Sequence, residues 1–75
     1  MFDLCDEYRR EIERIYGKET ADKSVVEYSK GWFYIGLAKR FRDGSIGCAR
    51  LYAQNYRTKD VIKMIAEMKL REPII

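Results

Sequence analysis

Basic and aromatic side chains are concentrated between residues 23 and 59 of this 75-residue chain. The segment carries eight lysines and arginines but two acids, a net charge of +6, and seven of the ten aromatic residues. Cations neutralise phosphates, and flat rings or guanidinium groups stack on bases. The pattern therefore favours a nucleic-acid-binding surface. Its candidate residues are Lys30, Trp32, Tyr34, Lys39, Arg40, Arg42, Arg50, Tyr52 and Arg57.

Two other interpretations of the same residues stay open. Aromatic residues favour β-strands in any case, and lysines on edge strands deter aggregation, so an ordinary sheet accounts for part of the pattern. Tyr, Trp and Arg are also the residues that dominate protein–protein interfaces. The alternative function is therefore a small inhibitor or adaptor, of the kind that phages or mobile elements encode. It would dock on an acidic protein, such as host nucleic-acid or defence machinery.

The residue types that most enzymes need are scarce. The chain has no histidine, no phosphate-cradling glycine loop and no Cys-x-x-Cys pair, so we expect no enzyme, no metal and no cofactor. The acids between Asp3 and Glu11 are better explained as a solvated helix face with ion pairs than as a cation site. Cys5 and Cys48 allow one bridge, but free thiols are the simpler interpretation.

Two helices are expected at the ends of the chain. Apolar residues recur every three or four positions in residues 3–16, where Asp3 can cap the first turn and Gly17 can end the last. This acidic helix leaves a third possibility, that it covers the basic segment and regulates access to it. The second helix is expected at 58–71, with Thr58 as its N-cap and Pro73 beyond its end.

Between these helices we expect strands at about 24–28, 32–40 and 46–53. Tight turns are predicted at "SKG" and at Asp43-Gly44. The fold class is then α+β, with the order helix, three-stranded antiparallel sheet, helix (αβββα), in one domain of residues 1–75. An all-helical alternative would place helices at 22–42 and 45–56, but glycines would then interrupt both.

A two-residue turn at Asp43-Gly44 fixes the expected register between the second and third strands. It pairs Arg42 with Ser45, Leu37 with Arg50 and Ile35 with Tyr52. One face then carries large aromatic and small residues, which favour a closely packed helix: Trp32, Tyr34, Gly36, Ala38, Ala49, Leu51 and Ala53. The opposite face mixes apolar and basic groups: Phe33, Ile35, Leu37, Lys39, Arg50 and Tyr52. A bulge after the turn would exchange the two faces.

Residues 31–67, "GWFYI…RDGSIG…NYRTKDVIKMIAE", carry a resemblance to known modules. They resemble the three-stranded-sheet-plus-helix DNA-binding modules of phage tyrosine integrase N-terminal domains and of plant ethylene-response factors. The resemblance implies that the sheet enters the DNA major groove and that strand side chains contact bases and phosphates. The positions that match these strand contacts are Trp32, Tyr34, Arg40, Arg42, Arg50 and Tyr52. The acidic N-terminal helix and Val61 depart from the pattern.

The ends of the chain bear on its partners and its location. The acidic N-terminus lacks the basic region of a signal peptide, and no apolar run approaches the roughly 18 residues that span a bilayer. We therefore expect a cytoplasmic, intracellular protein with no membrane segment.

A domain this small buries only about 60% of its unfolded surface. Packing of Ile74 and Ile75 against a second subunit would add burial, so a homodimer stays open as an assembly of this chain.

Overall fold

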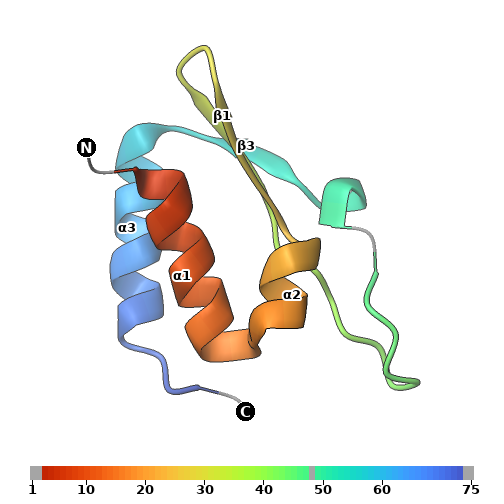
Figure 1. Cartoon of the computed structure of the whole chain (residues 1–75). Helices are drawn as coiled ribbons and strands as arrows, with labels where there is room; N and C mark the ends of the chain where they lie inside the picture. The colour runs from red at the N-terminus through yellow and green to blue at the C-terminus, as the bar shows by residue number, and fades with distance from the viewer. Residues whose placement is uncertain (1–2, 48, 74–75) are drawn as a thin grey trace.

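The computed structural model describes residues 3–47 and 49–73. The α+β fold class is confirmed: two helices precede a three-stranded antiparallel sheet, and a third helix follows it (Figure 1). The elements in chain order are α1 (Leu4–Tyr16), α2 (Lys18–Lys23), β1 (Val25–Ser29), β2 (Trp32–Gly36), the 3-10 helix η1 (Ala49–Leu51), β3 (Gln54–Tyr56) and α3 (Thr58–Lys69).

Helix α1 follows the prediction closely. The Asp3 side chain accepts a hydrogen bond from the backbone N–H of Cys5 at 2.9 Å, as an N-cap residue does. The apolar stripe is buried at Tyr8, Ile12 and Ile15. Gly17 ends the helix with a φ of 98°, a conformation that glycine adopts without steric cost. The local pattern alone therefore defines this element.

Helix α2 is absent from the prediction because "KETADK" has no apolar periodicity. Contacts from other elements hold it instead. The Arg9 guanidinium donates to the carbonyl oxygen of Ala21 at 2.9 Å and to that of Ser24 at 3.4 Å. The Ser24 hydroxyl donates to the carbonyl oxygen of Thr20 at 2.7 Å. The short helix is thus stabilised by the distant contact with Arg9, which its own sequence does not encode, and by the local bond at Ser24.

The β1–β2 hairpin confirms the turn predicted at "SKG". Lys30 and Gly31 have φ values of 51° and 86°, and Ser29 pairs with Trp32 across this two-residue turn. The sheet order is β1-β2-β3 and every neighbouring pair is antiparallel. Strand β2 ends at Gly36, however, so the strand predicted to reach residue 40 is four residues too long.

The third strand predicted at 46–53 is wrong. The two-residue turn predicted at Asp43-Gly44 does not form: the Gly44 N–H donates to the Phe41 carbonyl oxygen at 3.0 Å, so Arg42 and Asp43 are the central residues of the turn. The pairing beyond this turn stops at one isolated bridge between Arg40 and Ile46, one residue away from the expected register. The chain then passes over the Gly36 end of β2 as η1. It joins the sheet only at β3, Gln54–Tyr56, where Ile35 pairs with Gln54. A side chain at Gly36 would place Cβ 2.4 Å from the Ala49 carbonyl oxygen, so this crossing needs glycine there.

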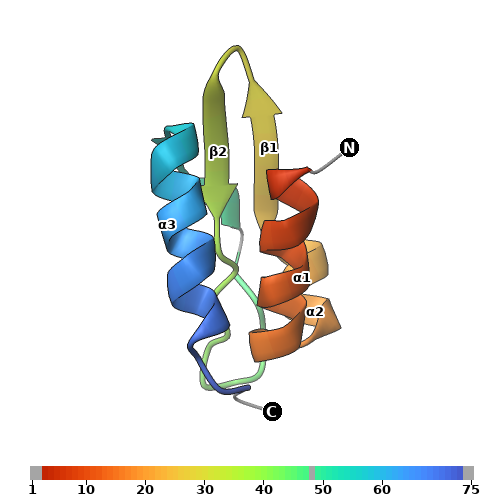
Figure 2. The same ribbon diagram turned by 90° about the vertical axis from the view of Figure 1, so that its left-hand side faces the viewer.

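The assignment of the two sheet faces is also wrong. Phe33 and Ile35, 5% and 4% exposed, form the core with residues of α1 and α3, whereas Trp32 is 41% exposed. The side chains of Phe33 and Ile35 are wholly apolar, whereas Trp32 and Tyr34 carry an N–H and an O–H group, so burial of the first pair is favoured. In Figures 1 and 2, α1 and α3 lie side by side on one face of the sheet and run in the same direction.

Helix α3 lies within the predicted range 58–71 but ends at Lys69. Its N-cap residue is Arg57 rather than Thr58, which is the first helical residue, and no side chain caps this end. Val61, Ile65 and Met68 are buried against α1 and the sheet. The helix therefore contributes the apolar face that its sequence predicts.

Candidate nucleic-acid interface

One face of the sheet is left uncovered by α1 and α3. We call it the open face, and its members follow from strand alternation and from the pairings of Glu27 with Tyr34 and of Tyr34 with Asn55. It consists of Glu27, Ser29, Trp32, Tyr34, Asn55 and Arg57. The acidic helix α1 packs on the other face, so it does not cover these residues. The open face is thus accessible at its centre and at its hairpin end.

An arginine lies over the ring of the exposed tryptophan of the open face. The Arg57 guanidinium carbon is 3.8 Å from the centroid of the Trp32 ring, within the range of a cation–π contact. Both side chains are exposed. Trp32 is the first residue of β2 and Arg57 directly follows β3, so the pairing of these two strands brings the side chains together. The pair therefore presents a positive charge and an aromatic surface at one point.

Arg50 lies where the open face meets η1. Its guanidinium forms an ion pair with the Glu27 carboxylate at 3.2 Å. The Tyr34 hydroxyl donates to the Arg50 backbone carbonyl oxygen at 3.4 Å. Beside this contact, a hollow of about 520 Å³ lies between α2, β1 and η1, and Arg9 and Lys23 contribute to its lining. This corner of the open face is polar and carries both signs of charge.

The remaining predicted site residues lie outside the strands. Lys39, Arg40 and Arg42 belong to residues 37–47, which we call the basic loop, and Tyr52 follows η1. The Lys39 ammonium lies 4.6 Å from the centroid of the Tyr52 ring. The Arg40 guanidinium approaches the Glu19 carboxylate of α2 at 3.6 Å. Arg40, Arg42, Arg50 and Tyr52 are therefore not the strand positions that the resemblance implies.

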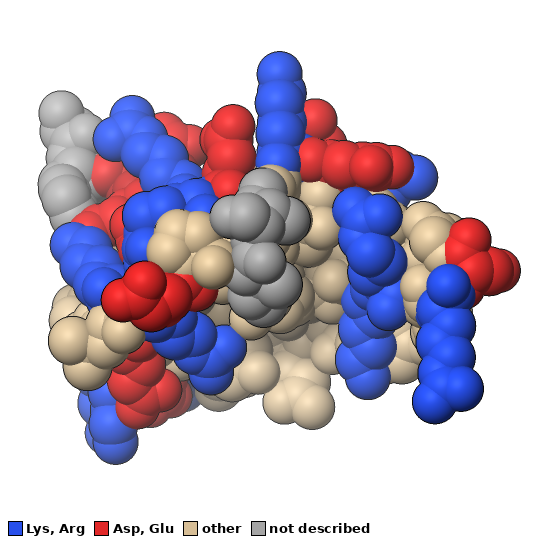
Figure 3. All heavy atoms as spheres, turned by 90° about the horizontal axis from the view of Figure 1, so that it is seen from below, with Lys and Arg blue, Asp and Glu red and all other residues tan. Residues whose placement is uncertain are grey.

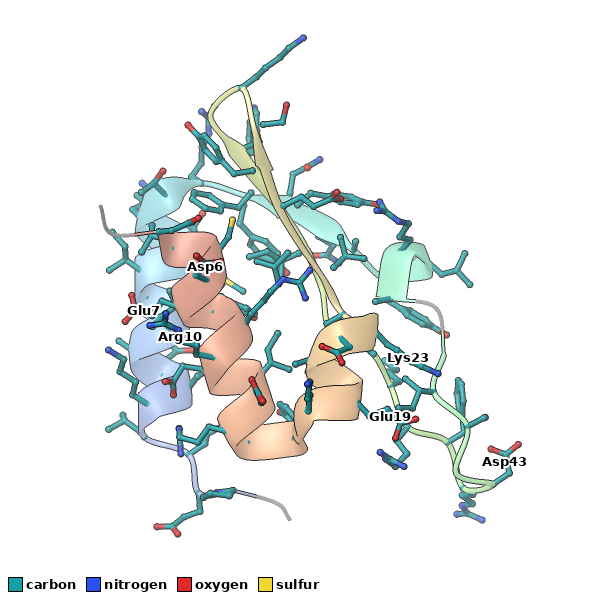
Figure 4. The ribbon with its side chains drawn as sticks, viewed as in Figure 1. Asp6, Glu7, Arg10, Glu19, Lys23 and Asp43 are labelled. Atoms are coloured by element: carbon teal, nitrogen blue, oxygen red, sulfur yellow. The ribbon has the colours of Figure 1, made fainter. Side chains whose placement is uncertain are left out.

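The basic loop extends away from the sheet. Figure 4 shows Glu19 on the side of α2 that faces this loop, and Asp43 at the loop's tip. Hydrogen bonds from the Ser45 hydroxyl and backbone N–H lower the pKa of the Asp43 carboxyl group. The tip thus keeps one negative charge among its cations. Seen from below, Lys and Arg side chains stand side by side on the right, where this loop lies (Figure 3).

The nine predicted residues therefore form two groups. Lys30, Trp32, Tyr34 and Arg57 belong to the open face and its hairpin tip, with Arg50 of η1 beside them, and the other four belong to the basic loop and its contact at Tyr52. Sequence reasoning missed Ser29 and Asn55, which are exposed on the open face. Ser29 could have been found from the strand alternation of β1, but Asn55 depends on the position of β3.

Two acidic side chains of α1 form ion pairs, as expected for a solvated helix face. Glu11 pairs with Arg14 at 2.9 Å, and Glu7 reaches across to Lys69 of α3 at 2.8 Å. Residues 3–47 and 49–73 contain no group of three or more potential metal ligands. Cys5 is a free, half-buried thiol, whereas Cys48, Ile74 and Ile75 lie outside the described residues.

No family model, no curated protein and no solved structure matches this chain. In the part of the chain that the structure describes, every helix is too short or too polar to cross a membrane. The interpretation of the site therefore depends on its own geometry and charge.

Proposed function

We propose that this chain is a small non-enzymatic module that binds nucleic acid through the open face and the basic loop. The observation that carries the proposal is the cation–π contact of Arg57 with Trp32, exposed on the sheet face that α1 and α3 leave uncovered. A guanidinium held on an indole ring offers a phosphate partner and a stacking surface together. Polar side chains at Ser29 and Asn55 add hydrogen-bonding groups on the same face.

The charge balance of these two regions supports the proposal. Glu27 and Glu19 engage Arg50 and Arg40. Four further cations in the two regions form no ion pair with the described residues: Lys30, Lys39, Arg42 and Arg57. Each contacted phosphate contributes a slope of about 0.7–0.9 to the dependence of log affinity on log salt. Four contacts then predict a loss of about 50- to 150-fold in affinity between about 50 and 200 mM salt.

Matched arginine variants test this proposal. Fluorescence anisotropy with labelled single-stranded and duplex oligonucleotides would compare Arg57→Ala and Arg42→Ala with Arg10→Ala, an exposed position on α1. We expect the first two variants to bind more weakly and to lower the salt slope by about one unit each. Arg10→Ala should bind like the wild type. Binding that does not depend on salt, or an equal effect of all three variants, would contradict the proposal.

A second candidate function is favoured by apolar side chains beside the cations. Leu51 is 79% exposed and Phe41 is 48% exposed, next to Arg50 and Arg42 respectively. A surface that binds phosphates does not need exposed apolar side chains. The centre of a protein–protein interface, in contrast, is commonly formed by apolar and arginine side chains. The chain would then be an inhibitor or adaptor, of phage or mobile-element type, that docks on an acidic protein. A captured partner that survives nuclease treatment and is lost with Leu51→Ser would favour this function.

A further inference from the structure

A small hollow lies where α1, α3 and the chain that leaves β2 meet. Figure 2 shows this chain beside the second half of α3. The volume of the hollow is about 240 Å³, below the range of about 300–1,000 Å³ that is typical of pockets for drug-sized ligands. A ligand of this hollow must therefore be small.

Much of the lining is apolar. Leu37, the residue after β2, and Met64 and Met68 of α3 contribute to it, together with Tyr8 and Tyr16 of α1. Methionine side chains are flexible and polarizable, so they adapt to ligands of different shapes. This part of the hollow favours a ligand with an apolar body.

The hydroxyl group of Tyr8 has no partner among the described residues, although Tyr8 is only 7% exposed. Every fully buried side-chain oxygen or nitrogen of the described residues has a hydrogen-bond partner. The Tyr8 oxygen is therefore not sealed in the core, and it is reached from the hollow that Tyr8 lines. A buried ring with an accessible, unpaired hydroxyl is what a polar ligand group needs.

The surroundings of this hydroxyl place it near the polar part of the lining. Burial raises the pKa of the Tyr8 hydroxyl, Tyr56 and Tyr16 raise it further, and Arg71 lowers it. Tyr16 and Arg71 line the same hollow. With a raised pKa, the Tyr8 hydroxyl keeps its proton at neutral pH and can donate a hydrogen bond.

Two further donors belong to this polar part. The Arg71 guanidinium donates to the Tyr16 hydroxyl at 3.0 Å, so the proton of that hydroxyl is free to point elsewhere. Arg71 forms no ion pair with the described residues. Glu67 is the one acid of the lining, and it too forms no ion pair there.

We propose that this hollow binds a small carboxylic acid with an apolar body. The carboxylate accepts hydrogen bonds from the hydroxyls of Tyr8 and Tyr16 and pairs with Arg71, while the apolar body lies against the methionines. Hydrogen bonds to an ionised group are about twice as strong as those between neutral groups. Three donors in one small hollow thus favour an anion over a neutral ligand.

An amine is the main competitor, because Glu67 could pair with it. An ammonium group in this hollow would, however, lie beside the positive charge of Arg71 and leave the donors of the lining without an acceptor. The site does not depend on the proposed function, since none of the nine candidate nucleic-acid-binding residues lines the hollow.

Three ligands with the same six-carbon body and different head groups test this proposal: hexanoate, hexanol and hexylamine. Each would be titrated into the wild-type protein with ¹³C-labelled methionine methyl groups, because two of the three methionines line the hollow. We expect hexanoate to shift the NMR signals of Met64 and Met68 saturably, with the roughly millimolar affinity of so small a ligand. Hexanol should bind at least about 10-fold more weakly. The absence of a saturable shift with all three, or tighter binding of hexylamine, would overturn the proposal.

Variants of the polar lining test how the head group is held. Tyr8→Phe keeps the ring and should weaken hexanoate binding about 10-fold or more. Arg71→Gln should remove the preference for hexanoate over hexanol, and Glu67→Gln should tighten hexanoate alone. Tyr28→Phe makes the same chemical change at an exposed position on β1, and it should bind like the wild type. Circular dichroism would verify that each variant is folded. Hexanoate affinity unchanged in both Tyr8→Phe and Arg71→Gln would overturn the site.

Discussion

Replacement of Ser24 by alanine tests the hydrogen bond between the Ser24 hydroxyl and the Ala38 N–H, which links the basic loop to the residue that follows α2. The buried Ser24 hydroxyl donates to the Thr20 carbonyl oxygen at 2.7 Å and accepts from the Ala38 N–H at 2.9 Å. Ser24→Ala leaves this N–H, which belongs to a residue only 5% exposed, without an acceptor. A buried donor without a partner costs about 1–3 kcal/mol. The Thr20 carbonyl keeps its bond from the Ser24 N–H at 3.0 Å, so it adds little to the cost.

Urea unfolding followed by circular dichroism measures this loss. We expect the free energy of unfolding to fall by about 1–3 kcal/mol and Tm to fall by at least about 4 °C. The control is Ser29→Ala on β1, an exposed serine whose hydroxyl has no hydrogen bond among the described residues. It should change stability by less than about 0.5 kcal/mol. A Ser24→Ala protein as stable as this control would refute the hydrogen-bonded link to the basic loop.

Two further predictions concern the segment between β2 and β3. Gly36→Ala would bring Cβ to 2.4 Å from the Ala49 carbonyl oxygen, and we expect a loss of about 1–3 kcal/mol in thermal or urea unfolding. A fully stable variant would contradict the crossing of η1 over the sheet. The pKa of Asp43 is lowered by Ser45, so the charged form is favoured in the folded protein. This contribution to stability is present above the unfolded pKa and is lost as pH falls through the folded pKa. Ser45→Ala should raise the Asp43 pKa in a carboxyl NMR titration, and an unchanged value would contradict the contact.

The elements that the sequence predicts correctly are those with local signals. Helix α1 has its apolar stripe and the Asp3 cap within the same 14 residues, and α3 has its stripe at Val61, Ile65 and Met68. The first hairpin needs only two residues with positive φ, which Lys30 and Gly31 provide. None of these features depends on a distant part of the chain. Their residue types and spacing are therefore sufficient.

The incorrect predictions depend on contacts between distant residues. The crossing of the sheet needs Gly36 against Ala49, and α2 needs Arg9 against Ala21, 12 positions away. No periodic pattern reports such contacts. A turn does form one residue before the predicted position, with Arg42 and Asp43 at its centre, but a turn that forms locally does not oblige the chain beyond it to continue as a strand.

In the candidate site, too, some features are predictable from local sequence and others depend on distant contacts. Residue types alone identify the cations and aromatics, because their chemistry does not depend on the fold. Their grouping depends on register, and a slip of one residue moves side chains to the opposite face. Trp32 and Arg57 meet only because β3 begins at Gln54, a position that the sequence does not reveal. The central contact of the proposed interface was therefore not predictable from the sequence.

Titration of the wild-type protein with nucleic acid, followed by the fluorescence of Trp32, tests the proposed function most directly. Trp32 is the only tryptophan and lies on the open face, so its emission reports on that surface. Duplex DNA, single-stranded DNA and RNA would each be titrated at about 50 and 200 mM salt, where four phosphate contacts predict a loss of about 50- to 150-fold in affinity. A saturable, salt-sensitive change with at least one of them is the predicted result. Unchanged emission with all three at both salt concentrations would contradict the proposal.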